Sequence, residues 1–188
     1  MELEGKVALI TGGTRGIGLA IAERLADQGA DLIMSYKKDH ERAAEAKALI
    51  ESKGRRAQVI SSDLRKPEGV DTLFEQVAEG LNQIDILVLN AAFGTMGDVI
   101  RMGRASWRAS YDTNVLSPML TAKGALPWLK KNGGVITATS TLGAHCAYPT
   151  YVAIGSSRAA LHVSPPSSLC AIAWLSQPSW LLARMNIE

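Results

Sequence analysis

Short apolar runs alternate with longer stretches of helical period along the first part of the chain. Residues 7–10 form the first apolar run, and residues 31–35 and 57–61 form two more. Between the runs, apolar side chains recur every three or four residues, and Gly29 and Gly54 follow them, as is typical at helix ends. This alternation predicts repeated strand–helix–strand units and therefore a parallel sheet.

Three further elements are expected in the middle of the chain. Residues 84–89 are apolar except for Asp85, which is the pattern of a central strand covered on both faces. Residues 107–131 have the period of a long helix with a bend near Pro118, and residues 135–139 supply a fifth strand. The predicted fold class is therefore α/β, a doubly wound parallel sheet.

The pattern changes abruptly after a helix that is expected over residues 151–161. The segment 162–188 holds three of the seven prolines, and Arg184 and Glu188 are its only charges. We therefore divide the chain into a domain of residues 1–161 and an atypical tail of residues 162–188. The tail is either a divergent ending or an out-of-frame translation product, and we favour the second alternative.

Composition and charge argue against several classes of function. The 188 residues carry a formal net charge of only +2 without long basic runs, so nucleic acid is not an expected partner. Cys146 and Cys170 lack the spacing of a metal site or a redox pair, so no metal is expected. No signal region or membrane-spanning stretch is recognisable, which predicts a cytoplasmic protein without a membrane partner.

A glycine-rich turn separates the first strand from the first helix. Residues 11–18 read Thr-Gly-Gly-Thr-Arg-Gly-Ile-Gly, and such a turn lets backbone amides approach a pyrophosphate at a helix N-terminus. Glycine turns also serve simple chain reversal, but the flanking strand and helix supply the context that a nucleotide site requires. The residues expected to bind a dinucleotide here are Gly12, Thr14, Arg15, Gly16, Ile17 and Gly18.

The spacing of this turn, TGxxxGxG, resembles that of the short-chain dehydrogenase/reductase family, and the resemblance extends from about residue 4 to residue 161. It implies a Rossmann fold and a nicotinamide dinucleotide as cofactor. It also implies that Asp63, with Leu64 beside it, contacts the adenine of that cofactor. The alternative for Asp63 is that its side chain caps a helix beginning near Pro67.

Two further segments carry the resemblance. Asn90, Ala91 and Ala92 resemble the family's Asn-Asn-Ala-Gly motif, with Leu89 in place of the first Asn. Phe93 stands where the family has Gly. The resemblance implies that Asn90, Ala91 and Ala92 bind the cofactor. Asn114 occupies the place of the family's helix Asn, which implies a catalytic role.

The end of the second strand indicates which nicotinamide cofactor is used. Enzymes that use NAD usually place a carboxylate about twenty residues past the glycines, whereas a cation there accommodates the 2′-phosphate of NADP. This chain has Tyr36, Lys37 and Lys38 at that place, and Arg15 adds a cation from the glycine turn. NADP(H) is therefore the expected cofactor, and the alternative is a solvated loop whose lysines bind nothing.

A reductase of this kind needs a group that hydrogen-bonds the oxygen on which negative charge develops as hydride arrives. The family's common signature, Tyr-x-x-x-Lys, is absent, because Val152 follows Tyr148 at that spacing and Gly155 follows Tyr151. Tyr151 instead matches the Tyr-x6-Lys spacing of enoyl-acyl-carrier-protein reductases, with Arg158 in place of Lys. The segment is most similar to the NADPH-dependent enoyl-acyl-carrier-protein reductase III.

This resemblance implies a role in fatty acid biosynthesis, with Tyr151 hydrogen-bonding the thioester oxygen and Arg158 holding the nicotinamide ribose. The two residues are about two helical turns apart, so they share one face of a helix. Ser140 or Thr141 is expected either to supply a further catalytic hydroxyl or to end the fifth strand. His162 is interpreted as an ordinary polar position.

Three functions are carried forward. The first is an NADP(H)-dependent enoyl-acyl-carrier-protein reductase, which Arg158 and the atypical tail would impair. The alternative within the family is a carbonyl reductase such as a 3-oxoacyl-acyl-carrier-protein reductase, and the alternative of another class is a non-catalytic NADP(H)-binding remnant. The family fold continues past residue 161 with strands and an acyl pocket that this sequence does not show. The resemblance also implies a homodimer or homotetramer.

Overall fold

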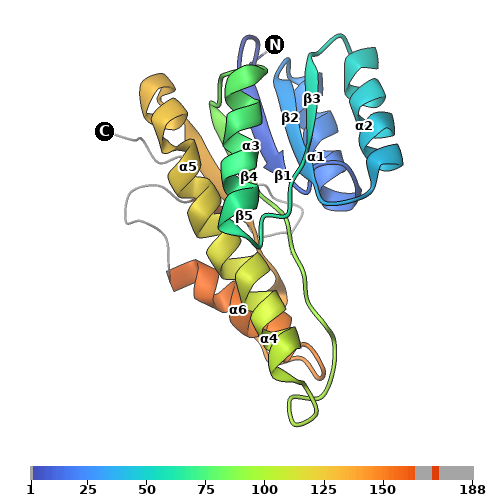
Figure 1. The fold of residues 1–188 in the computed structure, drawn as a ribbon, viewed down its shortest axis with the longest axis vertical. Coiled ribbons are helices and arrows are strands. Elements are labelled where there is room, and N and C mark those ends of the chain that lie inside the picture. Colours follow the sequence, from blue (N-terminus) through green and yellow to red (C-terminus); the bar gives the residue numbers. More distant parts are fainter. Residues whose placement is uncertain (1, 164–170, 174–188) are drawn as a thin grey trace.

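The computed structural model describes residues 2–163 and 171–173, and the apolar runs of the sequence become one parallel sheet in it (Figure 1). The strand order is β3-β2-β1-β4-β5-β6, and every pair is parallel. The strands are β1 (Val7–Thr11), β2 (Asp31–Tyr36), β3 (Ala57–Ser61), β4 (Ile86–Leu89), β5 (Val135–Thr139) and β6 (Ala171–Ala173).

Helices and short helical turns connect the strands. The connections between the strands contain α1 (Gly16–Asp27), α2 (His40–Ser52), α3 (Pro67–Glu79), α4 (Arg104–Tyr111), the π-helical turn η1 (Asp112–Leu116), α5 (Ser117–Asn132), the 3-10 turn η2 (Leu142–Ala144) and α6 (Val152–Val163). Within residues 2–163 and 171–173, we find no helix that combines the length and apolarity needed to cross a bilayer.

Both faces of the sheet are buried, because successive side chains of a strand point to opposite sides. Leu9 and Ile33 pack with α3 and α5 on one face, whereas Ile10, Leu32 and Met34 pack with α1 and α2 on the other. All five side chains are fully buried. This arrangement confirms the doubly wound parallel sheet expected from the sequence.

The long helix predicted over residues 107–131 is interrupted just before its proline. The backbone N–H of Ser117 donates to the carbonyl of Asp112, five residues earlier, in the π-helical turn η1. Pro118 follows directly and has no N–H for the preceding turn, which explains why the regular hydrogen-bond ladder breaks here. Beyond it, α5 runs along α3, and the rings of Trp128 and Phe74 stack with centroids 5.6 Å apart.

A short strand extends the sheet beyond the elements recognised from the sequence. Ala171–Ala173 pair in parallel with Thr137–Thr139, so the apolar part of the tail contributes β6. Three apolar residues are too few for periodicity to distinguish a strand from other structure. His162 and Val163 belong to α6, and residues 164–170 and 174–188 lie outside the described residues. The separate status of the tail as residues 162–188 stays a prediction.

The buried Asp85 joins the beginnings of three central strands. Its carboxylate accepts hydrogen bonds from the backbone N–H of Val7 at 2.9 Å, from Nζ of Lys6 at 3.1 Å and from Nε2 of Gln83 at 2.7 Å. Its backbone N–H donates to Val7, and its carbonyl accepts from the N–H of Val135. The one polar residue in an apolar run is therefore a structural connector.

Asp85→Ala should lower the free energy of unfolding by about 2–3 kcal/mol, because it leaves a buried backbone donor without its carboxylate partner. Asp27→Ala is the matched control, since Asp27 forms an exposed ion pair with Lys53 and its loss should cost about 1 kcal/mol or less. Urea denaturation of both variants measures the difference. Equal losses in the two variants would contradict the assigned role of Asp85.

Candidate active site

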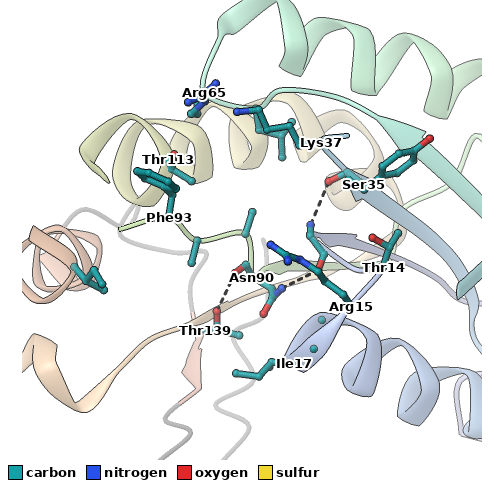
Figure 2. A pocket seen from close by; sticks show the side chains of 18 of the residues that line it. Thr14, Arg15, Ile17, Ser35, Lys37, Arg65, Asn90, Phe93, Thr113 and Thr139 are labelled. Atoms are coloured by element: carbon teal, nitrogen blue, oxygen red, sulfur yellow. Dashed lines mark hydrogen bonds between the residues drawn. The ribbon is translucent and has the colours of Figure 1, made fainter. Parts of the chain in front are cut away.

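The strand order reverses between β1 and β4, and a crevice forms at the carboxyl ends of strands where such a reversal occurs. A pocket of about 1100 Å³ lies there (Figure 2). It brings together all the residues singled out from the sequence except Asn114, namely Gly12, Thr14, Arg15, Gly16, Ile17, Gly18, Tyr36, Lys37, Lys38, Asp63, Leu64, Asn90, Ala91, Ala92, Ser140, Tyr151 and Arg158.

The glycine turn between β1 and α1 has a conformation that requires glycine. Gly12 and Gly16 have φ angles of 64° and 54°, in the left-handed region that other residues rarely adopt. A Cβ on Gly18 would collide with the carbonyl oxygen of Gly12, so only glycine lets the helix approach the turn this closely. No side chain caps the N-terminus of α1, and its first turn holds no acidic residue. Its N–H groups are therefore suited to an anion.

Asn90 and Thr11 fasten the glycine turn to the end of β4. Nδ2 of Asn90 donates to the carbonyls of Thr11 and Gly12 at 3.1 and 3.2 Å. Oγ1 of Thr11 accepts from the backbone N–H groups of Asn90 and Ala91 at 2.9 and 3.0 Å. Figure 2 also shows Thr139 donating to the carbonyl of Asn90. The side chain of Asn90 thus shapes the pocket by holding its backbone walls together.

One end of the pocket is built around the carboxylate of Asp63. Arg65 binds it with two hydrogen bonds of 2.8 and 2.5 Å, and Nζ of Lys37 lies 3.3 Å from Oδ2. The hydrogen bonds from Arg65, followed by that from Lys37, hold the pKa of the Asp63 carboxyl well below its usual range. The N-cap of α3 is Lys66, and its side chain makes no capping bond. Asp63 therefore organises cations, and the alternative of a helix cap does not describe its side chain.

Positive charge predominates along the pocket lining. Among the described residues, six cations line it against the two carboxylates of Asp39 and Asp63. Sequence reasoning found four of the cations and missed Arg42 and Arg65. Arg42 lies in the first turn of α2, four positions past Lys38, so its place in the sequence offered a signal, whereas nothing local indicated that Arg65 turns back to Asp63. The cations are Arg15, Lys37, Lys38, Arg42, Arg65 and Arg158.

Arg158 is almost completely buried in the wall of the pocket, with 3% of its surface exposed. Nη2 donates to the carbonyl of Ala91 at 3.1 Å, whereas the buried Nη1 has no hydrogen-bond partner among the described residues. Burial lowers the pKa of the guanidinium to about 10, and the nearby Tyr151 acts in the opposite direction. The group is therefore still cationic at neutral pH, and one of its donors is available to a ligand.

Tyr151 is held by small neighbours just before α6. A Cβ on Gly143 would overlap its ring, so the glycine of η2 leaves the space that the ring occupies. The Tyr151 hydroxyl lies 3.4 Å from Oγ1 of Thr141. Ser140, the other candidate hydroxyl, instead lies 2.5 Å from Nε2 of His162. The structure thus assigns different partners to the two hydroxyls that the sequence left as alternatives.

Asn114 lies behind the pocket instead of lining it. The residue is fully buried in η1, and Nδ2 donates to the carbonyl of Phe93 at 2.8 Å and to Oγ of Ser157 at 2.9 Å. Oδ1 accepts from the N–H of Phe93 at 3.0 Å. These bonds connect the segment after β4 to α6. In the structure the side chain of Asn114 holds the backbone of Phe93 in place. The catalytic role that the resemblance implies for Asn114 stays a prediction.

Comparison with known proteins identifies a matching family and similar proteins. The family model described as short chain dehydrogenase matches residues 6–164. A 1-cyclohexenylcarbonyl-CoA reductase from Streptomyces collinus is 36% identical over 156 residues, which cover 83% of this chain and 55% of the relative. A 3-oxoacyl-[acyl-carrier-protein] reductase from Escherichia coli (strain K12) is 31% identical over 145 residues, covering 76% and 58%. This chain thus spans little more than half the length of these two relatives.

A solved structure resembles the fold of this chain. It is a short chain dehydrogenase from Burkholderia cenocepacia J2315 in complex with NADP, with a TM-score of 0.81 and 38% sequence identity. The match covers 86% of this chain and 66% of that chain.

Proposed function

Since the chain belongs to the short-chain dehydrogenase family, we propose that it uses NADPH to reduce an enoyl thioester, as the resemblance to enoyl-acyl-carrier-protein reductases suggests. The observation that carries this proposal is the placement of Tyr151 and Arg158 in the wall of one pocket, at the longer of the family's two spacings. The acyl group would be carried by acyl-carrier protein or by a small thiol.

The pocket residues fit an NADP dinucleotide. The uncapped N-terminus of α1 suits a pyrophosphate, the excess of cations suits a phosphate on the ribose, and the unpartnered Nη1 of Arg158 suits a sugar hydroxyl. The similar Burkholderia cenocepacia structure, which contains NADP, supports the same cofactor. When bound, NADPH supplies the hydride for the reduction.

Tyr151 and its neighbours would then act on the oxygen of the substrate. The Tyr151 hydroxyl donates a hydrogen bond to the thioester oxygen as negative charge develops on it. Thr141 Oγ1 lies near enough to orient the hydroxyl of Tyr151. Arg158 holds the cofactor and adds positive potential to a pocket in which buried charges act strongly.

Three observations bear on the choice of substrate. The name of the Streptomyces collinus relative describes an α,β-unsaturated thioester, which supports enoyl reduction, as does the spacing from Tyr151 to Arg158. The Escherichia coli relative supports the second candidate, reduction of a 3-oxoacyl thioester. A non-catalytic NADP(H)-binding remnant is the third, since Arg158 replaces the family's Lys.

An assay of NADPH oxidation by absorbance distinguishes the three candidate functions. It is run in parallel with a trans-2-enoyl thioester and with a 3-oxoacyl thioester. Cofactor binding is followed by fluorescence in the same samples. Oxidation with the enoyl substrate supports the proposal, and oxidation with the 3-oxoacyl substrate alone supports the second candidate. Binding without oxidation identifies a remnant, and absence of binding contradicts all three.

Replacing Lys37 and Lys38 together by Ala should weaken NADPH binding at least about tenfold more than NADH binding, because the variant lacks two cations at the expected 2′-phosphate site. Fluorescence titration with both cofactors measures the ratio. Lys47→Ala, which removes an exposed lysine of α2 paired with Glu51, is the control and should leave the ratio unchanged. Equal weakening of both cofactors in the double variant would refute the assignment.

Tyr151→Phe should lower kcat about 100-fold or more, because it removes the hydrogen bond to the developing negative charge. NADPH affinity should stay close to that of the unaltered protein. Tyr148→Phe is the matched control, because Tyr148 is half exposed and its ring lies 6.4 Å from that of Tyr151. An unchanged kcat in the Tyr151→Phe variant would contradict a role of Tyr151 in the reaction.

Arg158→Met should weaken NADPH binding about tenfold or more, since it removes both the charge and the donors. Arg158→Lys should retain most of the affinity, because an ammonium keeps the positive charge within the same wall. Fluorescence titration and circular dichroism report binding and folding in each variant. If Arg158→Lys weakens NADPH binding as much as Arg158→Met does, then binding depends on the geometry of the guanidinium instead of its charge.

A further inference from the structure

His162 contacts the pocket through Ser140, although the proposed function gives it no role. Ser140 is one of the residues that line the pocket, and its Oγ lies 2.5 Å from Nε2 of His162. The ring of His145 lies against that of His162 with centroids 4.7 Å apart and an interplanar angle of 31°. Thr141, the neighbour of Ser140, contacts the hydroxyl of Tyr151. The histidine pair is thus linked to the wall on which the substrate oxygen is proposed to bind.

The hydrogen bond between Ser140 and His162 can run in either direction. A hydroxyl has one hydrogen, and a neutral imidazole nitrogen is either a donor or an acceptor. If Nε2 of His162 lacks a hydrogen, Ser140 must donate to it and presents only lone pairs to the pocket. If Nε2 carries a hydrogen, Ser140 accepts, and its own hydrogen is available to the pocket.

We propose that His162 is a positioning residue that sets the direction of the Ser140 hydroxyl and thereby determines whether Ser140 joins Tyr151 in hydrogen-bonding the substrate oxygen. Protonation of His162 places a hydrogen on Nε2. Ser140 must then accept from Nε2, and its own hydrogen is available to the pocket. The consequence for turnover rests on the proposed function, whereas the contact between the two side chains does not.

The surroundings of His162 determine the pH range of this effect. His145 faces it from the end of η2, and Arg158 lies one turn earlier on α6, while Ser140 at the end of β5 carries no charge. Burial, followed by the positive potentials of His145 and Arg158, lowers the pKa of His162 from its ordinary value of 6.5. The imidazole is therefore mainly neutral at pH 7, and kcat should rise as the pH falls through its pKa.

The first experiment compares pH profiles of thioester reduction between about pH 8 and about pH 5. The unaltered protein should gain about three- to tenfold in kcat toward low pH, the value of one hydrogen bond. His162→Gln should lack this step, because an amide does not titrate. His145→Gln should keep the step but move it to higher pH, since the electrostatic influence of His145 that lowers the pKa of His162 is removed. A His162→Gln protein with an unchanged step would overturn the proposal.

The second experiment tests the contact without turnover. The chain has three histidines, so nuclear magnetic resonance of ring-labelled protein follows each titration separately. Ser140→Ala should move the midpoint of His162 by about half a pH unit and leave the ring resonances of His40 unchanged. An unmoved His162 would overturn the proposal whatever the kinetics show. If no thioester is reduced, the proposed function fails, and this resonance shift alone decides whether Ser140 and His162 interact.

Discussion

The pocket depends on one local constraint, the fastening of the β1 turn to the end of β4. Thr11 and Asn90 lie 79 positions apart, yet each hydrogen-bonds the backbone of the other's strand end. The sheet brings the two strands together, and the strand order reverses at this point. Without these bonds, the glycine turn would lose the position from which the N-terminus of α1 faces the pocket. The anion site and the wall near Arg158 therefore share one support.

The two ends of the pocket differ in the burial and pairing of their charged groups. At the Asp63 end, partly exposed cations surround one carboxylate, an arrangement that suits a solvated phosphate. At the α6 end, one guanidinium is buried with an unpartnered donor among the described residues, next to hydroxyl groups. Burial there strengthens each interaction, so few polar groups are needed. A single elongated pocket thus combines an anion site with a compact polar site suited to hydrogen-bonding a reacting oxygen.

The local pattern of the sequence was sufficient for strands β1 to β5, the glycine turn and many of the residues that line the pocket. These features depend on periodicity within short segments and on side chains at strand ends, which parallel topology brings to one edge. The partners of those side chains were not predictable in this way. Lys37 is bound to Asp63, and Ser140 to His162, through contacts between residues more than twenty positions apart. Such pairings follow from the packed fold and leave no periodic signal.

The π-helical turn η1 also fixes how this chain tolerates changes in length. A π-helical turn holds one residue more than the α-helical path it replaces, so the turn absorbs the extra residue and α4 and α5 keep nearly the phase of one continuous helix. Deleting one residue within Asp112–Leu116 would restore a regular ladder and leave α5 near its present orientation, with Trp128 still against Phe74. The residues of the turn itself would shift, and Asn114 would lose its hydrogen bonds to Phe93 and Ser157. A deletion here would therefore leave the helical layer on the sheet and remove the side chain that ties the segment after β4 to α6.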